Sequence, residues 1–316
     1  MATAETLTAE DRILTTACGL LDRSDRGKLA LTGPEAKQFL NGQVTNDVEA
    51  LEPGRGCYAA FLTHKGKMRG DLRVLDLGDE LWLDTERVTL QELFNMIRRF
   101  KVGYDVEVHK RTLERALLSL IGPRSRAVAD AASLGRDEHD NAAGEVAGVP
   151  VRLVATDVGV DVICDAERGE EVRAGLAARG AAAVSEEAAE CLRVESGRPR
   201  WGLELDQATI PEEAGLNQRA VSFTKGCYVG QETVARLFYK GKPNRHLRGL
   251  RLSGPAEPGG GLGLGGRDVG RLGSVAVSPR HGAIGLAIVR REAQPGDRLA
   301  VGDGAVTAEV VALPFG

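Results

Sequence analysis

The alternation of hydrophobic and polar residues predicts a long mixed α+β part followed by a short tail of strands. Apolar runs over 57–62 and 72–77 flank the polar turn 64–67, which predicts a β-hairpin. A shorter apolar run over 81–83 predicts a further strand. Residues 90–100 repeat hydrophobic side chains at helical spacing, which predicts an amphipathic helix.

A second unit shows strand and helix patterns in alternation. We expect strands near 115–121 and 158–164, and helices near 124–132 and 169–178. This order is typical of a small ferredoxin-like unit. The sequence therefore predicts an α+β region over residues 1–245, with an inserted ferredoxin-like unit at about 106–183, and a C-terminal β-barrel domain over 246–316.

Beyond Arg245 the pattern changes to short alternating strands separated by glycine and proline turns. We expect strands at 247–252, 270–277, 282–289, 298–301 and 306–312. This spacing is typical of a small barrel or sandwich. Gly261–Gly266 matches the pattern G-x-G-x-x-G, but no helix pattern follows it. We therefore interpret it as a flexible loop and not as a dinucleotide site.

Composition and charge narrow the class of protein. The 316 residues carry a formal net charge of −4, which argues against direct nucleic-acid binding. Five scattered cysteines and five histidines show neither metal-site spacing nor a disulfide framework. No apolar run approaches the roughly 20 residues that span a bilayer, and the N-terminus lacks the layout of a signal peptide. We expect a cytoplasmic protein with no metal site and no membrane insertion.

The segment Lys225-Gly226-Cys227-Tyr228-Val229-Gly230-Gln231-Glu232 sets a cysteine between two glycines and beside a lysine. Residues 231–237 are mostly good helix formers, so Cys227 lies just ahead of a predicted helix N-terminus. The helix dipole and the lysine charge both favour a thiolate there. Gly226 and Gly230 free the backbone for tight turns or a close ligand. The segment predicts either a reactive thiol or a structural cysteine in a turn.

A polar segment over 192–217 precedes the cysteine motif. Its carboxylates are Glu195, Glu204, Asp206, Glu212 and Glu213, and its proline breaks exclude one continuous helix. A carboxylate accepts two parallel N–H bonds from a 2-amino-4-oxopyrimidine edge. Glu195 is the strongest candidate because it lies at a predicted helix end just before the break. Most of the others fit solvated acids or helix caps.

A likeness to known proteins extends over nearly the whole chain. It rests on Arg193–Pro199, Pro211–Leu216 and Lys225–Glu232, with Thr45–Val48 near the N-terminus and Leu313–Phe315 at the end. Together these residues resemble the aminomethyltransferase (glycine cleavage T-protein, GcvT) superfamily. The cysteine motif resembles its YgfZ-type branch of folate-binding proteins, which supports iron–sulfur cluster assembly or repair. The T-protein has no cysteine in this motif.

The resemblance implies a three-domain ring of the aminomethyltransferase folate-binding type, with a C-terminal all-β barrel. It implies that tetrahydrofolate, or a one-carbon derivative such as 5-formyltetrahydrofolate, binds in a central channel with Glu195 on its pterin. T-proteins carry an acidic pair after the equivalent hairpin turn, where this chain has Arg69-Gly70-Asp71 and keeps one acid. Asp71 is thus the candidate catalytic acid.

The remaining site residues follow from the same resemblance. Cys227 and Lys225 join Asp71 as catalytic candidates; Asn46, Glu204, Trp201, Tyr228 and Gln231 join Glu195 as folate contacts; Gly226, Gly230, Glu232 and Arg236 complete the motif. Tyr58, Trp201 and Tyr228 are the aromatic candidates for stacking on the pterin. The basic segment 240–248 fits a site for the polyglutamate tail or an acidic partner, and equally an ordinary solvated linker.

Three functions are compatible with these residues. The favoured one is a tetrahydrofolate-binding accessory protein for assembly or repair of iron–sulfur enzymes, with Cys227 as the working thiol. Its partners would be iron–sulfur assembly factors or client enzymes. A folate-dependent aminomethyltransferase or other one-carbon transferase is the activity to expect if the chain is an enzyme, and a ligand-free interaction scaffold is the third alternative. One cysteine cannot supply the four thiolates of a cluster, so a cluster role needs a partner, a second copy or small thiols.

Overall fold

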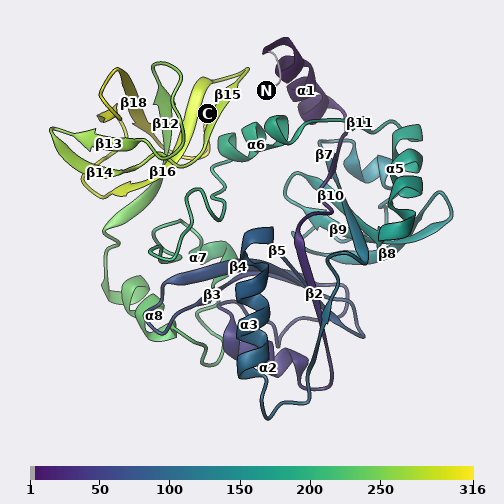
Figure 1. Cartoon of the computed structure of the whole chain (residues 1–316). Helices are drawn as coiled ribbons and strands as arrows, with labels where there is room; N and C mark the ends of the chain where they lie inside the picture. The colour runs from purple at the N-terminus through teal and green to yellow at the C-terminus, as the bar shows by residue number, and fades with distance from the viewer. Residues whose placement is uncertain (1–3) are drawn as a thin grey trace.

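Three β-sheets placed like the corners of a triangle make up the computed structural model, which describes residues 4–316 (Figure 1). The first three residues of the predicted 1–245 region lie outside the described residues. The arrangement confirms the predicted α+β fold with a C-terminal β-barrel. Within residues 4–316, no helix is both long enough and apolar enough to cross a membrane.

The first sheet contains the predicted hairpin. In spatial order it comprises β3 (Gly56–Leu62), β4 (Met68–Asp76), β5 (Leu81–Thr85), β2 (Gly27–Thr32) and β6 (Glu107–Lys110), all antiparallel. Helices α2 (Ala36–Gln43) and α3 (Leu90–Phe100), the latter preceded by the 3-10 turn η1 (Arg87–Thr89), pack on one face. Phe39, Leu40 and Ile97 are fully buried there, which accounts for the helical spacing of the apolar residues.

The second sheet is built from distant parts of the chain. Its order is β11 (Ala182–Ala183), β1 (Gly19–Asp22), β7 (Arg115–Ile121), β10 (Gly159–Asp165), β9 (Val149–Thr156) and β8 (Asn141–Val146). Helix α5 (Gly169–Ala178), after the 3-10 turn η2 (Ala166–Arg168), covers it through Val172 and Leu176. Because β1 pairs with β7, this sheet also takes strands from outside residues 106–183. The domain boundaries stay a prediction.

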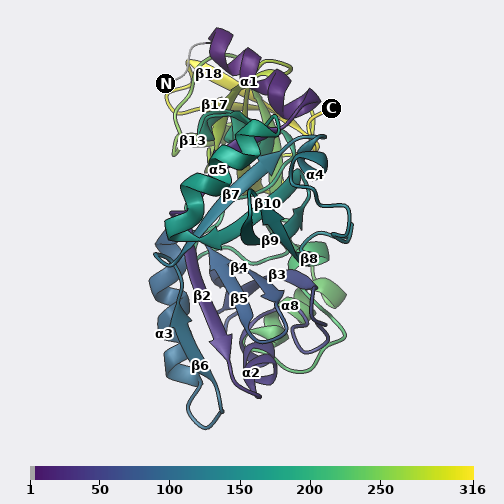
Figure 2. The same cartoon turned by 90° about the vertical axis from the view of Figure 1, so that its right-hand side faces the viewer.

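The first and second sheets pack face to face. Leu75 and Trp82 from the first sheet contact Leu117, Val154 and Ile163 from the second in one buried apolar cluster. Figure 2 shows the second sheet above the first. The faces that α2, α3 and α5 leave uncovered are thus turned toward each other.

The C-terminal strands form the predicted barrel. They are β12 (Arg245–Leu252), β13 (Gly261–Leu264), β14 (Arg267–Arg271), β15 (Val275–Ser278), β16 (Gly282–Arg290), β17 (Arg298–Val301) and β18 (Val306–Val311). β12 pairs with both β18 and β16, which closes the sheet on itself. Leu250, Leu299 and Val310 are fully buried inside.

Three local predictions were wrong. Gly261–Leu264 is strand β13 and not a flexible loop, because the left-handed Gly265 (φ 57°) and Gly266 (φ 78°) make the turn of a hairpin with β14. The strand expected at 270–277 is two strands, β14 and β15. The helix expected at 124–132 is only α4 (Ser125–Val128), because Asp130 takes a left-handed backbone (φ 54°) that ends it.

The remaining helices join the three sheets. α1 (Ala4–Thr16) packs against α6 (Glu186–Glu195) in an apolar cluster that contains Leu14, Ala188 and Val184, the last just before α6. α6 runs between the second sheet and the barrel, and α7 (Asn217–Ala220) and α8 (Gln231–Lys240) follow toward the first sheet (Figure 1). The segment between α6 and α7 therefore passes through the middle of the triangle.

Candidate functional site: a charged cavity and an exposed thiol

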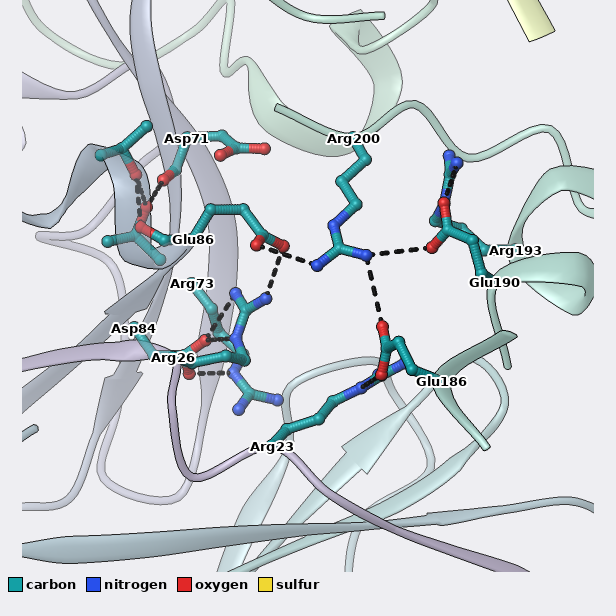
Figure 3. Close-up of polar contacts among 12 residues, drawn as sticks. Arg23, Arg26, Asp71, Arg73, Asp84, Glu86, Glu186, Glu190, Arg193 and Arg200 are labelled. Atoms are coloured by element: carbon teal, nitrogen blue, oxygen red, sulfur yellow. Dashed lines mark hydrogen bonds and ion pairs between the residues drawn. The ribbon is translucent and has the colours of Figure 1, made fainter. Parts of the chain in front are cut away.

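A cavity of about 490 Å³ lies between the first and second sheets and is bounded by α6 and the segment 196–201. This size is typical of small-molecule sites. Much of the wall is charged (Figure 3). Its basic and acidic members include Arg23, Arg26, Arg73, Arg193, Arg200, Arg219, Asp71, Asp84, Glu86, Glu138, Asp161, Glu186 and Glu190. The cavity is therefore suited to a polar or charged ligand.

Arg73 joins the two sheets at the floor of this cavity. Its guanidinium donates to Asp84 Oδ2 at 2.6 Å in the first sheet and to Asp161 Oδ2 at 2.7 Å in the second. Ser119 Oγ donates to the other oxygen of Asp161 at 2.7 Å, and Arg26 lies 3.1 Å from Asp84. Burial opposes ionisation, but the charges of Arg73 and Arg26 hold the pKa of Asp84 below its ordinary value.

Arg200 reaches across the cavity from the segment after α6 (Figure 3). It lies 3.3 Å from Glu86 at the end of β5, and 3.2 Å and 3.1 Å from Glu186 and Glu190 on α6. Burial disfavours the charge of Arg200, but the three carboxylates raise its pKa above the ordinary value. Arg200 therefore ties α6 to the first sheet through charge-assisted hydrogen bonds to all three carboxylates.

Asp71 and Tyr58 form a hydrogen-bonded pair in the cavity wall. Tyr58, from β3, donates its hydroxyl proton to Asp71 Oδ2, from the adjacent strand β4. Thr85 Oγ1 donates to the backbone carbonyl of Asp71 at 2.6 Å. Burial raises the pKa of Asp71 above the ordinary value, and burial together with the Asp71 charge raises that of Tyr58 further. Asp71 is thus a carboxyl group that holds a proton more readily than most.

Arg219 and Asn46 support this pair. The Arg219 guanidinium lies over the Tyr58 ring, 5.2 Å from its centroid, and pairs with Glu138. The Asn46 side chain donates to the backbone carbonyls of Tyr58 (2.9 Å) and Arg219 (3.1 Å). Asn46 does not line the cavity. It holds Tyr58 and Arg219 in place from behind the wall.

The lysine of the cysteine motif is fully occupied. Lys225 Nζ donates to the backbone carbonyls of Asn41 (2.5 Å), Val44 (2.9 Å) and Asn46 (2.7 Å). It also lies 5.2 Å from the centroid of the buried Tyr228 ring. Burial lowers the pKa of Lys225 to about 8. Lys225 therefore anchors the 41–46 segment, and neither it nor Tyr228 lines the cavity.

Cys227 is exposed and lies outside the cavity lining. Cys18, Cys164 and Cys191 are buried, and burial raises the pKa of the half-buried Cys57 to about 12. After Cys227 the chain turns at Gly230 (φ 86°) into α8. Gln231 begins that helix, Glu232 and Arg236 are exposed on it, and Gly226 faces open space. The predicted motif residues thus surround a thiol that is separate from the cavity.

Comparison with known proteins shows the family to which this chain belongs. A family model described as the GCVT N-terminal domain matches residues 2–225. The chain belongs to the GCVT family. It is 30% identical to an aminomethyltransferase of Rubrobacter xylanophilus, over 97% of this chain and 85% of that protein. It is also 30% identical to a putative chloroplastic transferase of Arabidopsis thaliana, over 94% and 71% of the two chains.

A solved structure gives the fold independently. The glycine cleavage system aminomethyltransferase T of Bartonella henselae superposes with a TM-score of 0.87. The alignment covers 98% of this chain and 89% of that one at 23% sequence identity. The fold is therefore the aminomethyltransferase type, as predicted.

In this GCVT family chain a glycine stands beside the cavity acid. Gly70 faces Phe61 across the hairpin, and a Cβ on Gly70 would lie 2.5 Å from the Phe61 ring. Side chains alternate along a strand, so position 70 points away from the face that carries Asp71. A second carboxylate at position 70 would need Phe61 to move, which accounts for the single acid.

Two predicted folate contacts lie at the barrel side of α6. The Glu195 carboxylate accepts hydrogen bonds from Ser278 Oγ and Arg280 and does not line the cavity. Buried Glu204 accepts from the backbone N–H of Ser274 at 2.6 Å. Both carboxylates fasten the α6 region to the barrel. Trp201, three residues before Glu204, does line the cavity.

His139 lines the cavity and was not predicted from the sequence. It is 9% exposed, its backbone is left-handed (φ 75°), and both of its ring nitrogens are buried without a hydrogen-bond partner. Burial, with the charges of Arg73 and Arg219, lowers the pKa of His139 to about 3. No motif marks this residue, because its place depends on the packing of the two sheets.

The structure thus brings together some predicted residues and separates others. Asp71, Tyr58 and Trp201 share the cavity wall, whereas the motif around Cys227 lies elsewhere. Among the side chains of residues 4–316, no cluster of three potential ligands could hold a metal ion.

Proposed function

We propose that this chain binds a reduced folate in the central cavity and supports the assembly or repair of iron–sulfur enzymes, with Cys227 as the working thiol. One observation carries the proposal: a charged cavity and an exposed cysteine of the YgfZ-like motif occur in one GCVT fold, and the cysteine is not part of the cavity lining. A ligand in the cavity therefore leaves the thiol free for a partner. All five cysteines are free, as in a reducing cytoplasm.

The cavity residues fit tetrahydrofolate or 5-formyltetrahydrofolate. Asp71 offers an acceptor for the N–H groups of a pterin, and Trp201 and Tyr58 offer aromatic surface. Arg26 and Arg200 also line the cavity, and the carboxylates of the glutamate tail would share their guanidinium groups with the protein carboxylates that pair with them. When bound, a reduced folate supplies nitrogen atoms that carry a one-carbon unit. The role of Asp71 is to orient the ligand and to hold a proton beside it.

An aminomethyltransferase is the second candidate. It is favoured by the position of Asp71 in the cavity and by relatives that bear that name. The single acid beside Gly70 and the exposed Cys227 favour the accessory role instead, because one-carbon transfer in the cavity does not use a thiol that lies outside the cavity lining. A scaffold without ligand would not need the charged wall.

Isothermal calorimetry with tetrahydrofolate and 5-formyltetrahydrofolate, on the wild type and the Cys227→Ala variant, tests the first part. Micromolar binding in both proteins is expected, because the thiol lies outside the cavity. Complementation of a null strain tests the second part: Cys227→Ala should lose support of iron–sulfur enzyme activity. Absence of folate binding, or full complementation by Cys227→Ala, would each overturn the corresponding part. Aminomethyl transfer by the purified protein would favour the second candidate.

A further inference from the structure

An exposed aromatic cluster lies at the end of α8. Phe238 is 48% exposed and Tyr239 is 65% exposed. The half-buried Phe223 stacks on Phe238 with the ring centroids 3.9 Å apart, and Tyr239 lies edge-on to Phe238 at 5.0 Å. Aromatic residues are enriched in the buried centres of protein interfaces, so this cluster has the chemistry of a contact surface.

This cluster lies close to Cys227. Phe223 packs at the C-terminal end of α8, whereas Gly230 immediately precedes its N-terminal end. The segment 223–230 therefore runs back along the helix, whose ten residues span about 15 Å. Cys227 is four residues from Phe223, so their Cα atoms are at most about 14 Å apart. A protein that covered the aromatic residues would also reach the thiol.

The charges around the cluster are mainly basic. Arg236, Lys240 and Lys242 are exposed on and just after α8, where Glu232 is the one acidic residue of the helix. Lys65 is exposed in the β3–β4 turn, which touches α8 because a Cβ on Gly66 would lie 2.7 Å from that of Thr233. The whole chain carries a net charge of −4, so this surface is opposite in sign to the chain as a whole. A basic surface of this kind speeds the encounter with an acidic partner and disfavours basic ones.

We infer that the α8 face, meaning Phe238 and Tyr239 with the exposed Arg236, Lys240 and Lys242 beside Cys227, is a docking surface for an acidic protein. The surface of the bound partner then lies against Cys227. The purpose of that contact rests on the proposed function, whereas the docking itself does not.

The first test uses two synthetic peptides, one rich in Asp and Glu and one rich in Lys. Each carries one aromatic residue and one cysteine in a mixed disulfide with thionitrobenzoate. The Cys227 thiolate attacks the peptide sulfur, the new disulfide joins peptide and protein, and thionitrobenzoate leaves and is counted by its absorbance. We expect the acidic peptide to react at least tenfold faster at low salt, with the difference shrinking at high salt. Cys227→Ala should abolish the reaction.

Matched variants decide whether the α8 face causes the faster reaction of the acidic peptide. Lys240→Glu combined with Lys242→Glu should reverse the preference, and Tyr239→Ser should slow the acidic peptide several-fold. The double reversal Arg267→Glu and Arg271→Glu, on barrel strand β14, should leave the preference unchanged. Equal rates for the two peptides, or a preference that survives the Lys240 and Lys242 reversal, would overturn the inference. So would a wild-type dimer that Tyr239→Ser dissociates, because the face would then bind a second copy.

A cellular readout separates this inference from the proposed function. In a null strain, the Lys240→Glu and Lys242→Glu protein should lose support of iron–sulfur enzyme activity while its affinity for tetrahydrofolate stays at the wild-type value. If Cys227→Ala complements fully, the proposed function fails while the peptide preference still stands. If the peptides react equally, docking fails whatever the cellular result.

Discussion

Asp71 owes its properties to its neighbours on the hairpin. Tyr58 satisfies one carboxylate oxygen, burial raises the pKa of Asp71, and Gly70 carries no second acid. The side chain therefore combines an acceptor for ligand N–H groups with a proton that is easily held. Its position could be predicted from the hairpin pattern, because period-two alternation sets the face of each strand residue.

Asp71→Asn should weaken binding of tetrahydrofolate by about 1–1.5 kcal/mol, because a charge-assisted hydrogen bond becomes a neutral one. Thermal stability at pH 7 should stay equal or rise, because a buried carboxyl with a raised pKa costs free energy when ionised. Calorimetry and thermal unfolding check both effects. Asp79→Asn, at an exposed position in the β4–β5 turn, is the control. Unchanged affinity in Asp71→Asn would remove Asp71 from the ligand site.

His139 should make stability depend on pH. Its folded pKa, about 3, lies below the unfolded value of 6.5, so the unfolded chain takes up the extra proton first. The free energy of unfolding is therefore unaffected by the titration of His139 above about pH 6.5 and falls as the pH drops toward 3. Between pH 7 and pH 5 the loss is about 2 kcal/mol. His139→Asn, which tolerates the left-handed backbone, should remove that part of the slope in urea unfolding. His64→Asn, exposed in the β3–β4 turn, should keep it.

Among the elements, the turn into α8 depends on one glycine. Gly230 has a φ of 86°, and a Cβ there would lie 2.6 Å from the carbonyl oxygen of Thr63. Gly226, in the same motif, has no neighbour within 4 Å of an added Cβ. The two glycines look equivalent in the sequence, and only the packing of α8 on the β3–β4 turn distinguishes them.

Gly230→Ala should destabilise the protein by about 2 kcal/mol or more, because a left-handed backbone disfavours a side chain and the methyl group meets a backbone oxygen. Gly226→Ala should change stability by less than about 0.5 kcal/mol. Urea unfolding of the two variants beside the wild type makes the comparison. Equal effects would mean that Gly230 can relax without cost.

Element positions were predictable where the local pattern sets them. The apolar spacing over 90–100 marks α3, and the alternation after Arg245 marks most barrel strands. It was harder to predict which part of the molecule each side chain contacts. On α6, Glu190 and Arg193 line the cavity, whereas Glu195 pairs with Arg280 near the barrel. A helix that lies between a sheet and a barrel is buried on two faces. Its sequence does not show which face contacts the sheet and which contacts the barrel.

At the scale of the molecule, the cavity exists because distant strands meet. β1 and β11 join the second sheet across long separations, and Arg73 on β4 meets Asp161 on β10. No local period predicts such pairings, so the sequence named Asp71, Tyr58 and Trp201 as candidates but could not predict the rest of the cavity wall, including His139. The family resemblance predicted the three-domain arrangement, whereas the position of the cavity within it follows from the packing of the two sheets.

Arg73→Met should be among the most destabilising single changes in this chain. It leaves Asp84 without one of its two arginines and Asp161 without its guanidinium partner, both buried, and breaking a buried pair in this way costs about 3–5 kcal/mol. Arg115→Met, which breaks the more exposed pair with Asp165, should cost about 0–1 kcal/mol.

The pH dependence separates lost charge pairing from lost packing in Arg73→Met. Without the Arg73 charge, the pKa of Asp84 rises, so the folded state binds more protons and the variant recovers stability relative to wild type as the pH falls from 7 to 5. Urea unfolding at both pH values measures this recovery. A deficit that is the same at pH 7 and pH 5 would mean that Arg73 acts through its packing, and that the two sheets are held together by the apolar contacts of Trp82 and Leu117.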